Sequence, residues 1–278
     1  MTITLAPEIP RTFRSRAGWA IRDTWVITGR DLAHWRQQPA AVIANTLVFP
    51  VMIAAMFGYL LGGAMTVPGG GDYRDFLMPG MFAMTMVFGI GATLSAVSAD
   101  AARGVTDRFR SLPMAAPAVI AGRAAADMLN SAVALAVLTG CGFAVGWHPH
   151  RGAARAVAAL GLLLLLRLAF LWIGVFLGLR FYGNSEAVSA VRTLEFPIGF
   201  LANPFVAVST MPAWLGAIAL WNPLSSTVTA ARQLFGDPVG ANPSWITSHA
   251  IIMAIAWPLL LTAAFFPLSV HRFQRLHR

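Results

Sequence analysis

Residues 154–179 read ARAVAALGLLLLLRLAFLWIGVFLGL, a run in which five leucines, Leu162 to Leu166, are followed by a deep arginine, Arg167. At a rise of about 1.5 Å per residue, roughly 20 apolar residues cross a hydrocarbon core of about 30 Å. The run is therefore long and apolar enough to be a transmembrane helix. Comparable runs predict five further crossings, at residues 40–63, 76–99, 124–146, 196–211 and 246–270.

The composition agrees with this fold class. Hydrophobic residues make up 57% of the 278 residues and charged residues only 11%, whereas a soluble domain carries about 25% charged residues. We expect an all-α, polytopic membrane protein with a single transmembrane domain over residues 1–278. It divides into a cytoplasmic N-terminal segment (1–36), a bundle of six spans (37–270) and a cytoplasmic tail (271–278).

The arginines set the expected orientation. All 20 basic residues are arginine. With the N-terminus inside, fifteen of them fall in cytoplasmic segments, and only Arg74, Arg151, Arg155 and Arg232 fall outside. This bias follows the positive-inside rule and predicts a bacterial inner (plasma) membrane protein with both termini cytoplasmic. The net charge of +9 does not indicate nucleic acid, because the arginines form short groups between apolar runs rather than one basic face.

An amphipathic helix is expected over residues 17–36. Four apolar residues would share one face of this helix because of their spacing: Ile21, Trp25, Leu32 and Trp35. Two tryptophans on that side suit a helix lying in the headgroup layer, in contact with membrane lipids. A helix packed on the base of the protein itself would fit the same pattern.

The uncharged stretch 196–231 is too long for one helix and holds Pro197, Pro204, Pro212 and Pro223. Proline removes a backbone donor and breaks helices. We expect a fifth span ending near Met211, followed by a re-entrant or surface hairpin on the external side. That hairpin would be broken at Asn222-Pro223.

Several kinds of site are not indicated. A phosphate-binding P-loop needs a lysine, and the chain has none, so no nucleotide motor of that type is expected. We expect no cofactor to be bound by this chain. Cys141 is the single cysteine, and His148 and His150 alone are a weak signal for a metal. No catalytic cluster emerges. Spacing allows only local pairs, such as Arg123 with Asp127, four residues apart.

The loop between the second and third spans carries the most specific motif, DAARGVTDRFRSLPM at residues 100–114. It resembles the cytoplasmic loop of the ABC-2 type permeases, and most closely the daunorubicin-resistance branch, whose members export drugs or complex lipids. WNPLS at 221–225 and AARQL at 230–234 extend the resemblance. Many relatives carry glutamate where this chain has Asp100.

The resemblance implies a permease that pairs with a second copy or a paralogue and with two ATP-binding cassette ATPase subunits. ATP and Mg would be bound by those subunits. The cargo would be a lipophilic drug, polyketide or complex lipid. The residues of the loop expected to couple the permease to the ATPase are Asp100, Arg103, Gly104, Asp107, Arg108, Phe109, Arg110, Ser111 and Pro113. Within this loop, Asp107, Arg108 and Arg110 would form ion pairs with the ATPase subunit, and Phe109 would be buried in the contact as an anchor.

A path for a lipophilic cargo could run along apolar residues of spans two and five. The candidates are Met81, Phe82, Phe88, Phe196, Phe200 and Phe205. Ordinary helix packing is the alternative at most of these positions. Arg167 would either contact cargo or brace helices, since an arginine at this depth faces a bundle interior or a wet cavity. The obvious acidic partner, Glu195, is a poor match in depth.

Two other functions are conceivable for a polytopic membrane protein. A lipid-modifying transferase needs clustered acidic residues or histidines at the membrane face, and a proton-coupled efflux transporter needs acids deep in several spans. Neither pattern is present in the sequence.

Overall fold

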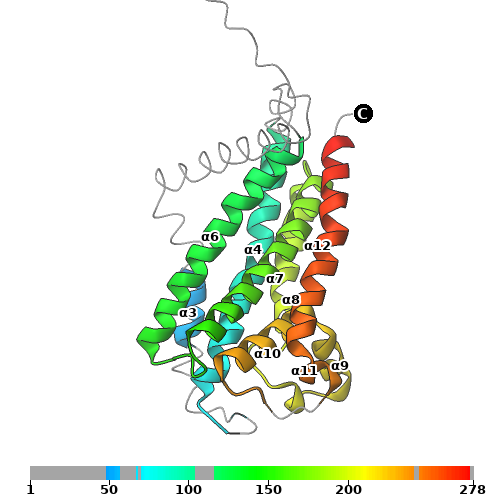
Figure 1. Cartoon of the computed structure of the whole chain (residues 1–278). Coiled ribbons are helices and arrows are strands. Elements are labelled where there is room, and N and C mark those ends of the chain that lie inside the picture. The colour runs from blue at the N-terminus through cyan, green and yellow to red at the C-terminus, as the bar shows by residue number, and fades with distance from the viewer. Residues whose placement is uncertain (1–47, 57–66, 68–69, 104–115, 241–243, 276–278) are drawn as a thin grey trace, which may run out of the picture.

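The computed structural model describes residues 48–56, 67, 70–103, 116–240 and 244–275. Every regular element in these ranges is helical (Figure 1). The elements are α3 (Phe49–Met56), α4 (Tyr73–Ala102), α6 (Ala116–Val145), α7 (Ala153–Arg180), α8 (Ser185–Phe200), the 3-10 turn η3 (Val208–Thr210), α9 (Ala213–Trp221), α10 (Pro223–Phe235), α11 (Trp245–Ser248) and α12 (Ala250–Arg275). The predicted helix at 17–36, the coupling loop beyond Arg103 and most of the first span lie outside the described residues.

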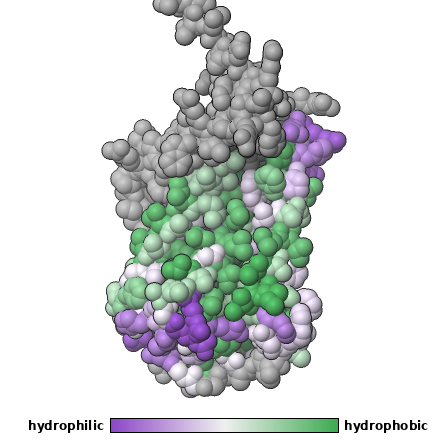
Figure 2. Space-filling view, in the orientation of Figure 1, coloured by the Kyte–Doolittle hydropathy of each residue, from purple (hydrophilic) through white to green (hydrophobic). Residues whose placement is uncertain are grey.

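Four helices, α4, α6, α7 and α12, are long and apolar enough to cross a membrane. They run alongside one another, and Figure 2 shows an apolar belt across the molecule with polar residues toward its ends. The predicted spans two, three, four and six are therefore confirmed as helices. The last one begins later than expected, because a short helix, α11, starts at a capping box formed by Ser244 and Thr247 and ends at Ser248, before α12 begins at Ala250.

Helix α7 is the centre of the bundle, with α4 packed on one side of it and α12 on another. The close approach to α4 depends on two glycines. A side chain at Gly174 would lie 3.0 Å from the carbonyl oxygen of Ile90, and one at Gly178 would lie 2.8 Å from Val97. The Gly174-x-x-x-Gly178 spacing is thus a real helix–helix contact motif.

The fifth predicted span lies earlier in the chain than expected: residues 196–211 were predicted, and the helix α8 covers Ser185–Phe200. Asn184 caps α8 by accepting from the backbone N–H of Ala187, but the helix ends at Phe200 rather than near Met211. Its 16 residues reach about 24 Å, less than a hydrocarbon core. Residues 201–207 continue without regular structure. A total of six spans remains a prediction.

The hairpin after α8 breaks where the sequence predicts. Asn222 accepts from the backbone N–H of Leu224, and Pro223 occupies the first turn of α10, where a missing N–H costs nothing. Gly236 ends α10 with a left-handed φ of 88°. In Figure 1, α9, α10 and α11 gather at the end of the bundle opposite the C-terminus.

Candidate transport path and its polar braces

Four phenylalanines from α4, α8 and the segment after α8 form a continuous line of rings, here called the aromatic ladder. Phe88 stacks on Phe196 with 6.0 Å between ring centroids; Phe196 and Phe200 are 4.5 Å apart, and Phe200 and Phe205 are 4.7 Å apart. These separations are typical of favourable aromatic pairs. Phe196 and Phe200 are 47% and 37% exposed, so the ladder borders an open face of the chain.

Met81 and Phe82 do not belong to this face. Both are fully buried in the main core. The Phe82 ring makes edge contacts with Trp147 at 5.2 Å and with Phe235 at 6.1 Å. In this structure their side chains fill the contact between helices, and their role as path residues stays a prediction.

Arg167 is a buried brace between three helices. Its Nη2 donates to Asp127 of α6 and to Thr93 of α4, both at 2.7 Å, and its Nε donates to Ser131 at 2.9 Å. Gly89 makes room for the guanidinium, since a Cβ there would lie 2.5 Å from its central carbon. A buried charge is tolerated when it is paired and hydrogen-bonded in this way.

This arrangement corrects one sequence expectation and agrees with another. Asp127 pairs with Arg167 rather than with Arg123, its neighbour along the helix. Glu195, as expected, does not pair with Arg167; its carboxylate accepts from the backbone N–H of Gly91. The surroundings of Arg167 support the bracing interpretation over contact with cargo.

Asp100 and Arg123 form an ion pair between the last turn of α4 and the start of α6. Asp100 is the first residue of the predicted coupling loop and Arg123 lies beyond its last residue, so the pair joins the two helices at the base of the loop. Both side chains are partly exposed, at 30% for Asp100 and 26% for Arg123. Asp100 was expected to contact the ATPase, and the structure gives its carboxylate a partner within the chain.

Arg232 holds the irregular backbone that follows α8. Its side chain is fully buried. Its Nε donates to the carbonyl of Phe76 at 2.9 Å, and its Nη2 donates to the carbonyls of Asn203 and Pro204, both at 3.0 Å. Non-helical backbone at membrane depth persists only where protein or water satisfies its polar groups. Arg232 provides these hydrogen bonds. The sequence indicated Arg232 only as a basic residue on the external side, and its role in holding the backbone was not predicted.

The same segment packs tightly on α4 and on the hairpin. A side chain at Gly80 would lie 2.3 Å from the carbonyl oxygen of Pro204, so only glycine fits at this contact. Tyr73 donates to the carbonyl of Phe205 at 3.3 Å, and Asn222 donates to that of Leu201 at 3.1 Å. The C-terminal end of α8 is thus fixed to α4 and to the junction between α9 and α10.

A family model for ABC-2 type transporters matches residues 22–235, which is most of the chain. The chain belongs to the ABC-2 type transporter family. It is also similar to the daunorubicin resistance ABC transporter permease protein DrrB1 of Streptomyces coeruleorubidus. The two are 30% identical over 256 residues, which cover 92% of this chain and 87% of that protein.

As an ABC-2 permease, the chain is a transport component without a catalytic domain of its own. Members of this family bind no nucleotide; the ATPase is a separate subunit with which the permease associates. The chain is a multi-pass protein of the cell membrane.

At the hairpin end of this ABC-2 permease, a polar clasp joins the α6–α7 loop to the end of α10. Trp147 donates to Asp237 at 2.9 Å, the His150 ring lies 3.3 Å from the other carboxylate oxygen, and the backbone N–H of His150 donates to the carbonyl of Phe235. Burial raises the pKa of Asp237 to about 6, although the bonds from Trp147 and His150 oppose that rise. Within the described residues, no group of three metal-binding side chains occurs.

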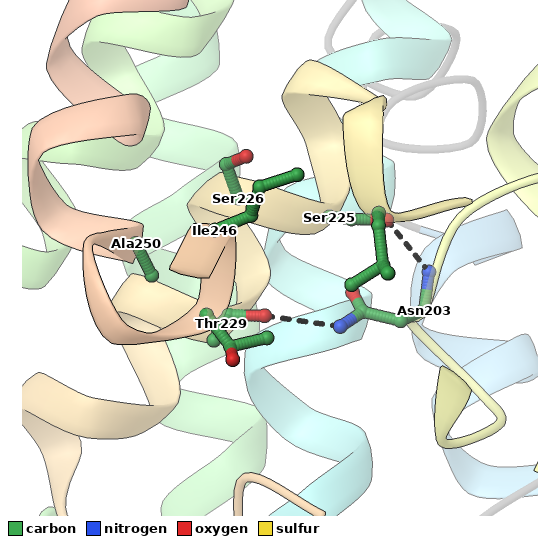
Figure 3. A pocket seen from close by; sticks show the side chains of 8 residues that line it. Asn203, Ser225, Ser226, Thr229, Ile246 and Ala250 are labelled. Carbon is green, nitrogen blue, oxygen red and sulfur yellow. Dashed lines mark hydrogen bonds between the residues drawn. The ribbon is translucent and has the colours of Figure 1, made fainter. Parts of the chain in front are cut away.

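A polar pocket lies between the hairpin and the start of α12 (Figure 3). In it, Asn203 donates through its backbone N–H to Ser225 at 3.2 Å and through its side-chain amide to Thr229 at 3.0 Å. The cavity has a volume of about 10 Å³, far below the roughly 300 Å³ of a ligand pocket. It anchors residue 203 and is too small to hold the cargo of an exporter.

Proposed function

We propose that this permease exports a lipophilic molecule, with ATP hydrolysed by a separate ATPase subunit, and that the cargo moves along the aromatic ladder. The ladder is the observation that carries this proposal. It combines stacked rings with an open face, and α8 packs principally on α4 among the described helices. Such a surface accepts apolar and aromatic cargo without a fixed hydrogen-bonding pattern.

In this proposal the open face of α8 lies at a seam with a second permease, either another copy or a paralogue, in a six-span arrangement with both termini cytoplasmic. Two ATPase subunits bind the cytoplasmic face and grip the coupling loop. The exposed apolar residues of α8 support such a seam. The resistance function in the name of the relative from Streptomyces supports a drug or another lipophilic compound as cargo.

The ion pairs Asp100–Arg123 and Asp127–Arg167 provide a route by which movement of the loop reaches the helix bundle. Movement of the loop pulls on α4 and α6 together, because Asp100 and Arg123 join them at its base. One helical turn deeper, Asp127 passes that movement to α7 through Arg167. Such a linked set of helices would tilt as one body and open the seam beside α8.

The test is transport by the permease reconstituted in vesicles with its co-purified ATPase subunit, using daunorubicin and a fluorescent phospholipid as probes. Phe196→Ala combined with Phe200→Ala should lower ATP-dependent transport of at least one probe about tenfold or more, a loss of about 1.4 kcal/mol in the rate-limiting step. The matched control is Leu194→Ala. That residue is 54% exposed on the same helix but points to a different side.

Unchanged transport of both probes by the double variant would remove the ladder from the path. A protonophore separates ATP-driven export from the proton-coupled alternative. The proposal expects transport to survive the protonophore and to stop without ATP. The opposite pattern would favour a secondary transporter.

A further inference from the structure

Helix α9 turns three large side chains away from the protein. Trp214, Ile218 and Trp221 are 67%, 50% and 61% exposed, and their spacing of four and three residues places them on one helical face. The opposite face is packed, since Ala219 is fully buried and a side chain at Gly216 would lie 3.3 Å from Val208. The exposed face of α9 therefore lies outside the core.

A third tryptophan extends this face. Trp245 of α11 is 62% exposed and stacks on His249 at 4.6 Å, and α11 packs against α9. The surface then continues onto the first turns of α12, where Ile251, Ile252 and Ile255 are exposed. Because α12 is one of the four candidate spans, we expect lipid to cover this continuation.

The chemistry of the face suits the boundary between headgroups and acyl chains. Tryptophan has a large apolar ring and one N–H donor, and it is enriched at membrane–water interfaces. Helix α9 has nine residues and no charge, so at about 14 Å it cannot cross the membrane. We propose that the Trp214–Ile218–Trp221 face, together with Trp245, binds the phospholipid surface of the external leaflet and holds α9 flat in that interface.

This contact would fix the depth of the end of α8. Asn222, which directly follows α9, donates to the carbonyl of Leu201, which directly follows α8. A lipid-anchored α9 therefore sets the level at which the aromatic ladder ends. The lipid contact holds for any cargo, and its assignment to the external leaflet rests on the proposed orientation with both termini cytoplasmic.

The test uses spin labels on the full chain in vesicles of phosphatidylethanolamine and phosphatidylglycerol. The background variant is Cys141→Ala, which removes the single native cysteine, and the label is attached through Ile218→Cys. Collisions with oxygen, which dissolves in lipid, are compared with collisions with a water-soluble nickel complex. The controls are Leu259→Cys, exposed midway along α12, and Arg155→Cys, exposed in the first turn of α7.

The label at 218 is expected to collide mainly with oxygen and to report a depth between the two controls, at the headgroup boundary. Adding Trp214→Ser and Trp221→Ser should shift the label toward the values of the Arg155→Cys control. Water-like values at 218 in the parent variant would overturn the proposal. Shielding from both reagents would also overturn it, because a second copy of the chain would then cover the face.

Discussion

The guanidinium of Arg232 lies 3.5 Å from the centroid of the Phe76 ring, while its Nε donates to the carbonyl of that same residue. One arginine thus combines a cation–π contact with hydrogen bonds to an irregular backbone segment 28 residues away in the chain. The geometry needs a planar fork, which lysine does not provide.

The first prediction concerns this arginine. Arg232→Lys keeps the charge but leaves carbonyls of residues 203 and 204 unpaired, at a cost of about 1–3 kcal/mol each. We expect a clear fall in the thermal unfolding midpoint of the purified permease in detergent. Arg155→Lys, an exposed position, is the control and should unfold at the parent temperature. Equal midpoints for both variants would refute the structural role of Arg232.

The second prediction concerns the buried pair of Arg167 and Asp127. Removing either partner leaves an uncompensated charge, so Arg167→Met or Asp127→Asn should each destabilise the fold by about 3–5 kcal/mol. Combining Arg167→Met with Asp127→Leu should recover a large part of that loss. Unfolding of the three variants and the parent chain provides the measurement; strictly additive losses would mean that the two residues do not interact.

The same double variant tests whether the Arg167–Asp127 pair does more than hold the helices together. If Arg167 only joins helices, Arg167→Met with Asp127→Leu should retain ATP-dependent transport whenever its stability is recovered. A stable double variant that has lost transport would show that the pair does more than hold the helices together, either by passing movement from the loop to α7 or by contacting cargo.

The third prediction concerns the ion pair at the base of the coupling loop. Asp100→Arg and Arg123→Asp should each reduce coupled transport, because each places like charges in contact. The exchange of both residues should restore it. If Asp100 acted by binding the ATPase, as its place in the motif first indicated, the exchanged pair would stay inactive.

The fourth prediction is a pH dependence caused by Asp237. Its pKa is raised from 3.8 to about 6 by burial, so between these values the folded chain binds more protons than the unfolded chain. The contribution of this residue to stability therefore falls as the pH rises from about 4 to about 6. We expect the gain in unfolding midpoint on going from pH 7 to pH 5 to be smaller in Asp237→Asn than in the parent. An identical pH profile in both would contradict this assignment.

The sequence predicted the elements that depend on local composition. Apolar runs located α4, α6, α7 and α12, because a helix in lipid satisfies its backbone internally and needs only length and hydropathy. The helix break at Asn222-Pro223 and the glycine contact at Gly174 and Gly178 were also predictable, since proline, asparagine caps and small residues act through local geometry.

The partners across the bundle were not predictable in the same way. Arg232 and Asp127 were interpreted from their position along the chain, but their partners lie 28 to 156 residues away. Hydropathy locates each helix but does not show which residues of different helices lie at the same depth in the membrane once the helices tilt. One available signal was Asp127 itself, an acid inside an apolar run, which in a membrane calls for a basic partner.

The early end of α8 has a similar cause. Nothing in residues 196–211 except the prolines marks Phe200 as the last helical residue. The irregular segment beyond it is held by other elements: Gly80 leaves room for its backbone, and Tyr73 and Arg232 donate hydrogen bonds to its carbonyls. Those contacts come from other elements, so the end of the helix is a tertiary effect.

The central claim is that a separate ATPase drives this permease through the loop at 100–113. The most direct measurement is ATP-dependent transport by vesicles that contain the permease and its ATPase, with Arg108→Glu and Arg110→Glu combined in the loop. We predict that this double variant inserts normally and that ATP hydrolysis no longer drives transport. Transport at the parent rate by the double variant, or ATP-driven transport by the permease without any ATPase subunit, would contradict the account.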